Sequence, residues 1–146
     1  MKKIIALLAI VFAAHAGFAK DNTISNNKVL DAFRQEFGNI EKVEWHKTDN
    51  SFVAKFSLNS SRITAHFDED GTLLATSRNI SDTQLPTRVI TRLIKKYPGQ
   101  IIHNIVEYVC EDNTRYIITL ESNSAWTVLK AEDTGSLSVL NRLVKM

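Results

Sequence analysis

The side chains with the strongest potential for chemistry are His46, His66, His103 and Cys110. Nucleophilic catalysis needs a nucleophile, a base and a group that orients the base, all within hydrogen-bond reach. None of the three histidines lies in a Gly-x-Ser-x-Gly turn or near a helix start that could offer an oxyanion hole. Cys110 falls in a predicted strand without an adjacent basic residue to lower its pKa, and a single cysteine excludes an intramolecular disulfide. The sequence therefore predicts a protein that is not an enzyme.

Two polar clusters could instead hold a metal ion. The run Asp68-Glu69-Asp70-Gly71 is acidic, but a calcium loop needs a distal acidic ligand and no acid follows until Asp82. We interpret this run as a hairpin turn. His46 and His66 fall on the same face of two predicted strands, where two imidazoles and a nearby Asp could hold zinc. Scattered surface histidines are the simpler interpretation, so we predict neither a metal nor a cofactor.

Residues 1–19 have the pattern of a secretory signal peptide. Lys2-Lys3 precedes an uninterrupted apolar run at 4–14, and small residues stand at Gly17 and Ala19 before the expected cleavage site. The apolar run is too short to cross a bilayer core of about 30 Å. We expect export to the periplasm or the outside of a bacterial cell, with a mature chain of residues 20–146 that has no membrane span.

Charge narrows the class of partner. The chain has 18 Lys and Arg and 16 Asp and Glu, and loss of Lys2 and Lys3 with the signal leaves 16 of each sign. A mature net charge of zero argues against a general nucleic-acid binder, which needs a basic excess. One predicted helix carries a basic stripe of Arg88, Arg92, Lys95 and Lys96. This stripe could meet an acidic partner, but we interpret it as a solvated helix face.

Helical spacing predicts two helices, at 28–37 and 86–97. The apolar face of the first is formed by Val29, Leu30, Phe33 and Phe37. The apolar face of the second is formed by Val89, Ile90, Leu93, Ile94 and Tyr97. Gly38 ends the first helix, Pro86 suits the first turn of the second, and Pro98-Gly99 ends it.

Alternating runs rich in β-branched and aromatic residues predict four strands after the first helix, at 41–47, 51–58, 62–68 and 72–78. The turns between these strands are Asp49-Asn50, Asn59-Ser60 and Glu69-Asp70-Gly71. Similar turns recur later in the chain, each displaced by the same number of residues from its counterpart. They are Asn113-Thr114, Asn123-Ser124 and Asp133-Thr134-Gly135. The two helices match at a slightly smaller shift, so we expect a longer helix-to-strand link in the second copy.

These patterns predict an α+β fold of two tandem units, at about 26–80 and 81–146. Each unit is a helix followed by a four-stranded antiparallel meander. A unit of about 60 residues is marginally stable alone. We therefore expect the two units to share one curved sheet, with the helices packed on one face.

Four stretches carry a resemblance to a known family: 43–45 (VEW), 52–56 (FVAKF), 65–74 (AHFDEDGTLL) and 85–89 (LPTRV). Together they resemble the PepSY-like, β-lactamase-inhibitor-like domains of secreted or periplasmic bacterial proteins. The resemblance covers nearly all of the mature chain and implies a helix-plus-sheet architecture with a largely uncharacterised function. The second unit departs from the pattern, because it lacks the matching tryptophan and the Phe-Asp pair. No contact residue of an inhibitor can be matched to this chain.

The two predicted units differ in the outer face of their sheet. The first unit has a polar outer set: Glu44, His46, Lys55, Ser57, Arg62, Thr64 and His66. In the second unit the inward set is Tyr116, Ile118, Leu120, Leu129 and Ala131, but the opposite parity also holds the apolar residues Ile117, Trp126 and Val128. The outer face of the second unit could therefore be apolar, and it should then be covered by a partner protein, a second copy of the chain or the C-terminal segment 136–146.

Two alternatives stay open from sequence. Tyr108 shares its parity with Val106 and Cys110, and these three could face inward because a buried Glu107 would be costly. A β-bulge or a one-residue shift of register would likewise turn Trp126 into core. On the outward interpretation, we name four candidate protein-binding residues: Tyr108, Ile117, Trp126 and Val128.

The sequence thus predicts an exported, non-catalytic module that binds another protein of the cell envelope, with inhibition as one form that this binding could take. The contact would use the sheet or its edge, and self-association into a homo-oligomer is a second possibility. The alternative is a periplasmic carrier of a small ligand or metal on a concave sheet surface. The C-terminal segment 137–146 is ambiguous, because Leu137 and Val139 alternate as in a strand while Leu140, Leu143 and Val144 could form a helical face.

Overall fold

The computed structural model describes residues 24–146, so the expected signal peptide at 1–19 lies outside the described residues. Helix α2 (Asn27–Phe37) is followed by β1 (Val43–Lys47), β2 (Ser51–Leu58), β3 (Ser61–Asp68) and β4 (Leu73–Asn79). A short 3-10 helix, η1 (Asp82–Gln84), precedes α3 (Thr87–Lys96). Helix α3 is followed by β5 (Ile101–Cys110), β6 (Asn113–Glu121), β7 (Ala125–Glu132) and β8 (Leu137–Val144).

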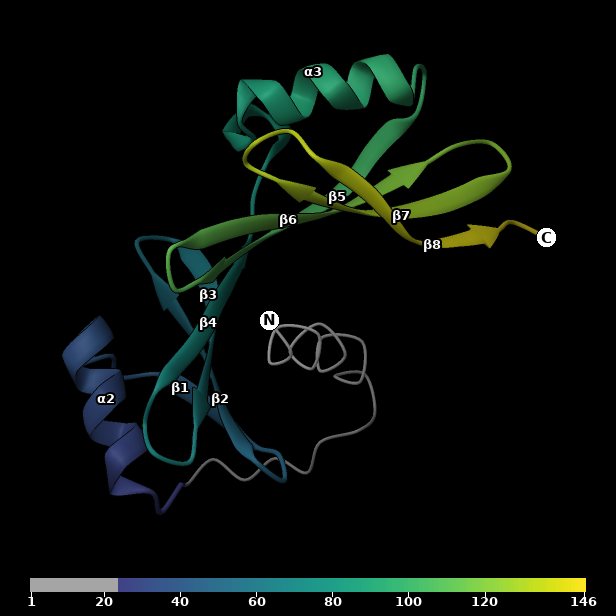
Figure 1. Cartoon of the computed structure of the whole chain (residues 1–146). Helices are drawn as coiled ribbons and strands as arrows, with labels where there is room; N and C mark the ends of the chain where they lie inside the picture. The colour runs from purple at the N-terminus through teal and green to yellow at the C-terminus, as the bar shows by residue number, and fades with distance from the viewer. Residues whose placement is uncertain (1–23) are drawn as a thin grey trace.

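The eight strands form one antiparallel sheet in chain order, which confirms the predicted α+β class (Figure 1). The sheet bends between β4 and β5, and both helices lie on its outer side (Figure 1). Register shifts interrupt the β3–β4, β5–β6 and β7–β8 pairs. Such bulges increase the local twist of a sheet and so contribute to its curvature.

The register shows that both helices cover the same face of the sheet. Ile63 pairs with Arg78, Arg78 with Glu107, and Glu107 with Tyr116, and directly paired residues point to the same side. Ile63 packs against the core under α2, whereas Tyr116 belongs to the core under α3. We call this the helix side of the sheet and the opposite side the open face.

Two separate cores lie on the helix side. The core under α2 is mainly aromatic, and its buried residues are Val29, Phe33, Trp45, Phe52, Ala54, Phe56, Ala65 and Phe67. The ring of Phe33 lies 5.0–5.3 Å from the rings of Phe37, Trp45 and Phe56. The core under α3 is mainly aliphatic, and its buried residues are Leu85, Val89, Leu93, Ile105, Tyr116, Ile118, Leu120, Leu129 and Ala131.

Two sequence expectations for α3 and β5 are corrected. Ile94 was expected on the apolar face of the helix, but it is 68% exposed because it lies at the flank of the face that buries Val89 and Leu93. The extra residues before β5 were expected in the helix-to-strand link. They lengthen the strand instead: β5 has ten residues against five in β1, with a register shift between Ile102 and Asn104.

The ambiguity of the C-terminus is resolved in favour of a strand, since Leu137–Val144 pairs with β7 as the last strand of the sheet. No helix within residues 24–146 is long and apolar enough to cross a membrane.

Candidate protein-binding surface

The open face has a different character in the two halves of the molecule. In the N-terminal half, the register places on it the polar set expected from sequence, including Glu44, His46, Lys55, Thr64 and His66. In the C-terminal half, apolar side chains predominate along part of this face. None of the helices and strands described in residues 24–146 packs against it (Figure 1).

The four candidate residues named from sequence all lie on the open face of the C-terminal half. Ile117 on β6 pairs with Val106, and Tyr108 follows Val106 by two residues on the same side of β5. Val128 on β7 pairs with Thr119, which follows Ile117 by two residues on β6. The candidate residues therefore step diagonally from one strand to the next. Diagonal neighbours of this kind stand about 7–8 Å apart, within reach of large side chains. The diagonal continues to Trp126, which pairs with Leu143 on β8. We call the following six residues the apolar band: Val106, Tyr108, Ile117, Trp126, Val128 and Leu143.

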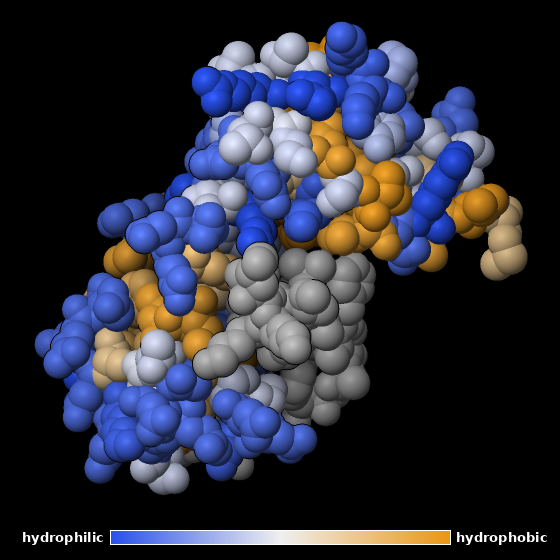
Figure 2. Space-filling model, viewed as in Figure 1, coloured by the Kyte–Doolittle hydropathy of each residue, from blue (hydrophilic) through white to orange (hydrophobic). Residues whose placement is uncertain are grey.

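The band runs from β5 across the sheet to its last strand. Arg115 and Lys130 border it on one flank, whereas Asn104, Thr119 and Glu121 border it on the other. Figure 2 shows hydrophobic surface gathered over the strands of the C-terminal half, below α3. Apolar residues with a polar border are the usual composition of a protein contact surface.

Two alternatives that sequence left open are settled by the register. Val106, Tyr108 and Cys110 do not face the core; Glu107 does, because its strand partners Arg78 and Tyr116 lie on the helix side. The expected cost of a buried Glu107 is offset by Arg78, whose Nε lies 2.6 Å from Glu107 Oε1. Trp126 is likewise outside the core, since β6 and β7 pair without a register shift from Arg115 to Glu121, which places Trp126 on the same side as Val128.

Trp126 is held in place by its neighbours on the open face. The His103 ring packs edge-on against it at 4.7 Å between centroids, and Lys145 Nζ lies 4.7 Å from the centre of the indole. Glu121 fixes that lysine, with Nζ 2.6 Å from Glu121 Oε1, and His103 Nδ1 lies 3.8 Å from Glu121 Oε2. An aromatic side chain immobilised in this way loses little conformational entropy on binding.

Partial burial also affects the polar groups of the band region. It raises the pKa of the Tyr108 hydroxyl above its ordinary value, with a smaller contribution from Cys110. It also raises the pKa of the Cys110 thiol, an effect that Arg115 opposes and Glu111 increases. Cys110 is therefore a poor nucleophile at neutral pH.

The histidines are separated on the sheet. His46 and His66 share the open face, as expected, but Val53 lies between them in the same row, so their backbones are two strand spacings, about 9.6 Å, apart. His46 Nε2 lies 3.0 Å from Glu44 Oε1, and burial lowers the pKa of His66, with Lys55 adding to the effect. Within residues 24–146, no three His, Cys, Asp or Glu side chains gather closely enough to hold a metal ion.

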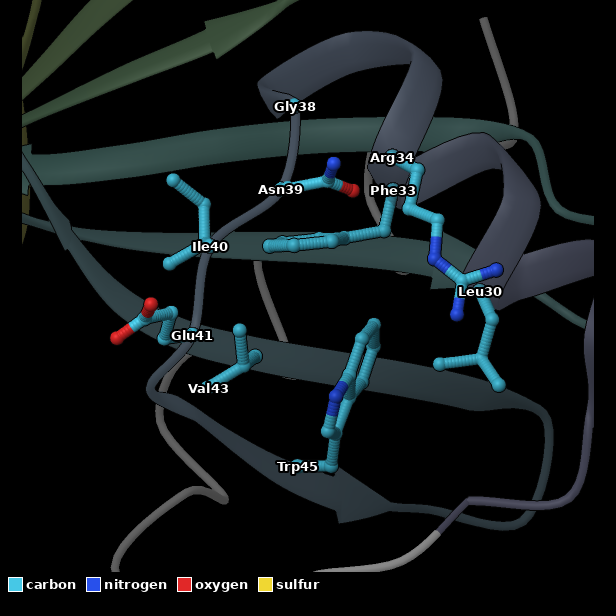
Figure 3. A pocket seen from close by; sticks show the side chains of 9 residues that line it. All are labelled: Leu30, Phe33, Arg34, Gly38, Asn39, Ile40, Glu41, Val43 and Trp45. Carbon is cyan, nitrogen blue, oxygen red and sulfur yellow. The ribbon is translucent and has the colours of Figure 1, made fainter.

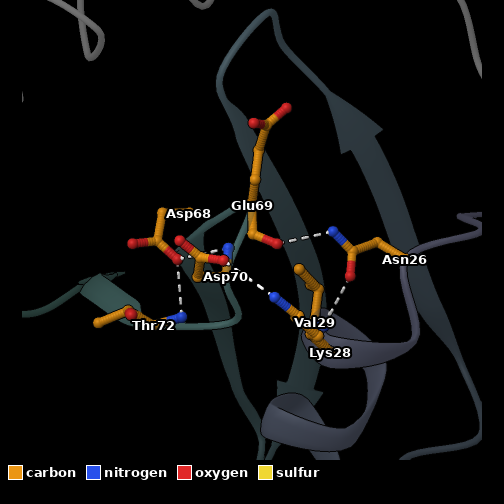
Figure 4. Close-up of polar contacts among 7 residues, drawn as sticks. All are labelled: Asn26, Lys28, Val29, Asp68, Glu69, Asp70 and Thr72. Atoms are coloured by element: carbon orange, nitrogen blue, oxygen red, sulfur yellow. Dashed lines mark hydrogen bonds and ion pairs between the residues drawn. The ribbon is translucent and has the colours of Figure 1, made fainter.

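The acidic run 68–71 is a hairpin turn, as interpreted from sequence (Figure 4). Asp68 Oδ1 accepts hydrogen bonds from the amides of Asp70 at 3.0 Å and Thr72 at 2.8 Å. The turn is also tied to the start of α2: Asn26 Nδ2 donates to the Glu69 carbonyl at 2.9 Å, and Lys28 Nζ lies 3.0 Å from Asp70 Oδ1. The acidic side chains therefore shape the turn and dock it on the helix.

A small open pocket with a mixed polar and apolar lining lies on the helix side, between the end of α2 and β1 (Figure 3). Its volume is about 290 Å³, and its apolar lining is formed by Leu30, Phe33, Ile40, Val43 and Trp45. Arg34 and Glu41 supply charged groups at this site. The sequence gives no sign of this pocket, because its apolar lining residues have the pattern of ordinary core.

Three residues around Trp126 do not follow from the sequence pattern that predicted the candidate residues. Leu143 was placed in an ambiguous segment, whereas His103 and Lys145 reach the indole only because β5, β7 and the C-terminus meet in the sheet. The alternation of Leu143 with Asn141 was a usable signal for the first. The other two had none, since their approach depends on a bulge and on strand order.

No protein-family model and no curated protein matches the chain. Solved structures do. A BLIP-like protein from Bacteroides fragilis is 18% identical with a TM-score of 0.69, over 84% of this chain and 87% of that one. A DUF2874 family protein from Bacteroides ovatus is 16% identical with a TM-score of 0.72, over 84% and 89%. A candidate periplasmic protein from Bacteroides eggerthii is 12% identical with a TM-score of 0.71, over 84% and 90%.

At these identities the likeness concerns the fold alone. It supports the β-lactamase-inhibitor-like architecture that the sequence resembles, and it has no bearing on the PepSY-like part of that resemblance. Contact residues do not follow from a shared fold, so function has to be argued from the surface itself.

Proposed function

We propose that this chain is an exported, non-catalytic module that binds a protein of the cell envelope through the apolar band. The bound partner would present an apolar ridge that lies diagonally across β5 to β8. Tyr108 and Trp126 are the aromatic anchors of the contact, and Ile117 and Val128 fill the space between them. Arg115, Lys130 and Glu121 form its polar border, where they would influence partner choice more than affinity.

The contrast between the two halves of the open face carries this proposal. Both halves belong to one sheet, and in each half every second residue of the strands is buried against a helix on the same side of that sheet. Only the C-terminal half places an apolar band on the other side, where stability of the core does not require one. Contiguous apolar surface of this kind usually marks an interaction site.

The location is part of the proposal. The Lys-Lys start, the apolar run at 4–14 and the small residues at 17 and 19 support export, and a structural neighbour described as a periplasmic candidate agrees with it. We expect intact-mass measurement of the protein purified from its native envelope fraction to give a chain that begins at Lys20.

We further propose that the chain consists of two diverged copies of one unit, at about 26–80 and 81–146. A matching contact supports this: a Cβ added to Gly71 would lie 2.7 Å from the Lys28 carbonyl oxygen, and one added to Gly135 would lie 3.1 Å from that of Arg88. Gly71 and Gly135 are separated in the chain by the same number of residues as the matching turns of the two units. Lys28 and Arg88 are separated by the same number of residues as the two matching helices. Each glycine allows a hairpin turn to rest on the start of a helix.

The test is capture from envelope and secreted extract of the source organism on immobilised residues 20–146. Each retained protein is identified, purified and titrated against the wild-type chain and against Trp126→Ala and Tyr108→Ala. Loss of an aromatic anchor is expected to weaken binding by about 2 kcal/mol, or thirtyfold. The matched controls are Lys55→Ala and Thr64→Ala on the open face of the N-terminal half, which should bind as the wild type does.

The proposal requires that the band variants stay folded by circular dichroism. Binding that is weakened equally by the band variants and by the controls contradicts the proposed surface. Failure to retain any protein, with a folded and monomeric chain, contradicts protein binding and favours the second candidate function.

That second candidate is a small-ligand carrier, and the pocket between α2 and β1 favours it. About 290 Å³ is enough for a small apolar molecule, with Arg34 available for an anionic group. Native mass spectrometry of the protein isolated from its own organism tests it. A bound mass that disappears in Val43→Trp, a substitution that fills the pocket, supports this function, and a bare chain contradicts it.

A further inference from the structure

The two edges of the sheet are protected to very different degrees. Edge strands expose backbone groups that can pair with another chain, and proteins usually blunt them with short strands and charged residues. β1 follows this rule, since it has five residues, three of which are Glu44, His46 and Lys47. β8 has eight residues and exposes Val139, Leu143 and Val144 by 58%, 56% and 75%.

The hydrogen-bond pattern identifies which β8 groups face outward. The Lys145 amide donates to the Ser124 carbonyl at 2.9 Å, so in an antiparallel pair the backbone groups of Arg142 and Val144 point away from β7. At the other end of β8, the Glu132 amide donates to the Ser136 carbonyl, so the backbone groups of Ser136 point toward β7. Because the direction alternates from residue to residue, the backbone groups of Val139 point away from β7. The Arg142 amide finds its acceptor in a side chain, Asn141 Oδ1, at 2.8 Å.

The outward-paired residues also share one side of the sheet. Val139, Arg142 and Val144 pair with Leu129, Thr127 and Ala125, all of which are buried on the helix side. A ninth strand would therefore cover two exposed valines and meet one cationic side chain. On the open face it would extend the apolar band beyond Leu143, so the edge and the band form one continuous surface.

Charge indicates what kind of strand fits. The two charged residues of 137–146 are Arg142 and Lys145, and Lys145 is already bound to Glu121 at 2.6 Å. Within the described residues Arg142 makes no ion pair. A second copy of β8 would bring only basic charge to this edge, which argues against self-pairing.

We propose that β8 accepts an extended segment of the partner protein as a ninth strand, with an acidic residue opposite Arg142 and apolar residues opposite Val139 and Val144. This rests on the proposed function as a protein-binding module and adds the mode of recognition. Main-chain pairing would supply the affinity, and the alternate side chains would supply the selectivity.

The probe is a blocked nine-residue peptide with threonine at every odd position and Val, Glu, Val and Val at the even ones. It is titrated into ¹⁵N-labelled residues 20–146 and followed by NMR. We expect saturable shifts at the outward amides of Val139, Arg142 and Val144, and intermolecular NOEs to β8. The inward amides of Leu143 and Lys145 should keep their hydrogen bonds and exchange rates.

A charge exchange sharpens the test. Arg142→Glu should weaken the glutamate peptide about threefold and strengthen a lysine-containing analogue by a similar factor. Arg92→Glu makes the same change of charge on the exposed stripe of α3 and should leave both affinities unchanged. Equal effects of the two variants would show a general charge effect and overturn the pairing with Arg142.

Three other outcomes overturn the proposal. Absence of shifts in β8 at millimolar peptide means that the edge does not accept a strand. Shifts confined to Tyr108 and Trp126 place the peptide on the band and leave the proposed function intact. A concentration-dependent dimer in sedimentation, with the outward amides protected in the absence of peptide, assigns the edge to a second copy of the chain. Conversely, strand addition without a Trp126-dependent envelope partner supports the edge and contradicts the proposed function.

Discussion

The N-terminal half (residues 24–80) and the C-terminal half (81–146) each have an α-helix followed by four strands, with η1 before the helix of the second, but they use the two sides of the sheet differently. The first half concentrates aromatic rings under α2, keeps its open face mainly polar, with Val53 and Ala75 as its apolar members, and has a short edge strand. The second half has an aliphatic core, an apolar band on the open face and an apolar edge strand.

This difference separates what stability requires from what it leaves free. The helix side of each half must be apolar, because a helix is buried against it. The open face carries no such requirement, so its composition can follow function. The following variants test that separation, in order of decreasing expected effect.

The two tryptophans should respond in opposite ways to truncation. Trp45 is 6% exposed and its ring lies 5.3 Å from that of Phe33, so Trp45→Ala is expected to cost about 3–5 kcal/mol of the free energy of unfolding. Trp126→Ala on the open face should cost less than about 1 kcal/mol. Urea denaturation of both variants measures the difference. Similar losses would mean that Trp126 is part of the core.

The two hairpin glycines offer a finer comparison. Gly71 and Gly135 have φ of 83° and 89°, where an alanine is strained by about 1–2 kcal/mol. At Gly71 the added Cβ would also overlap the Lys28 carbonyl oxygen at 2.7 Å, against 3.1 Å to Arg88 at Gly135. Gly71→Ala should therefore lower the melting temperature more than Gly135→Ala does. The reverse order would show that the first hairpin adjusts more easily than its contacts indicate.

The ion pair where the halves meet should have a smaller effect. Arg78 and Glu107 pair directly between β4 and β5, and their side chains are 40% and 15% exposed. Glu107→Gln is expected to cost about 1 kcal/mol, because it weakens the bond to a partly solvated arginine. Asp31→Asn, which breaks an exposed pair with Arg34 in the first half, is the matched control and should be nearly neutral in the same denaturation experiment.

The thiol of Cys110 should give the mildest effect, on reactivity alone. Burial raises its pKa, so the thiolate fraction at pH 8 is smaller than in an unfolded chain and the reaction with a thiol reagent is slower. The reaction rate should rise with pH, and the pH range of this rise should lie above the range for free cysteine. A rate equal to that of the urea-unfolded protein at pH 8 would contradict the burial of this side chain.

Much of this architecture could be anticipated from local pattern. The helices end where glycine and proline end the apolar periodicity, and the turn at 69–71 occurs where Gly71 permits a positive φ. Alternation also separated Ile117, Trp126 and Val128 from Tyr116, Ile118 and Leu129. These features depend on residues close together in the chain, so the sequence contains them directly.

Other features depended on partners that are distant in sequence. The side of the sheet that Glu107 faces was uncertain, because the cost of burying it is set by Arg78, which belongs to the other half of the chain. The extension of β5 and the three register shifts follow from strand pairing, which no single segment specifies.

By itself, the sequence determined the α+β class, the order of helices and strands, and the alternate residues that form the two cores, since each follows from local periodicity and turn chemistry. Only the tertiary structure decided that the apolar residues of β5 to β8 form one diagonal band, that His103 and Lys145 hold Trp126, and that β8 is an open edge. The physical reason is that strand register and strand order bring together residues from four separate segments, and these relations exist only once the sheet has formed.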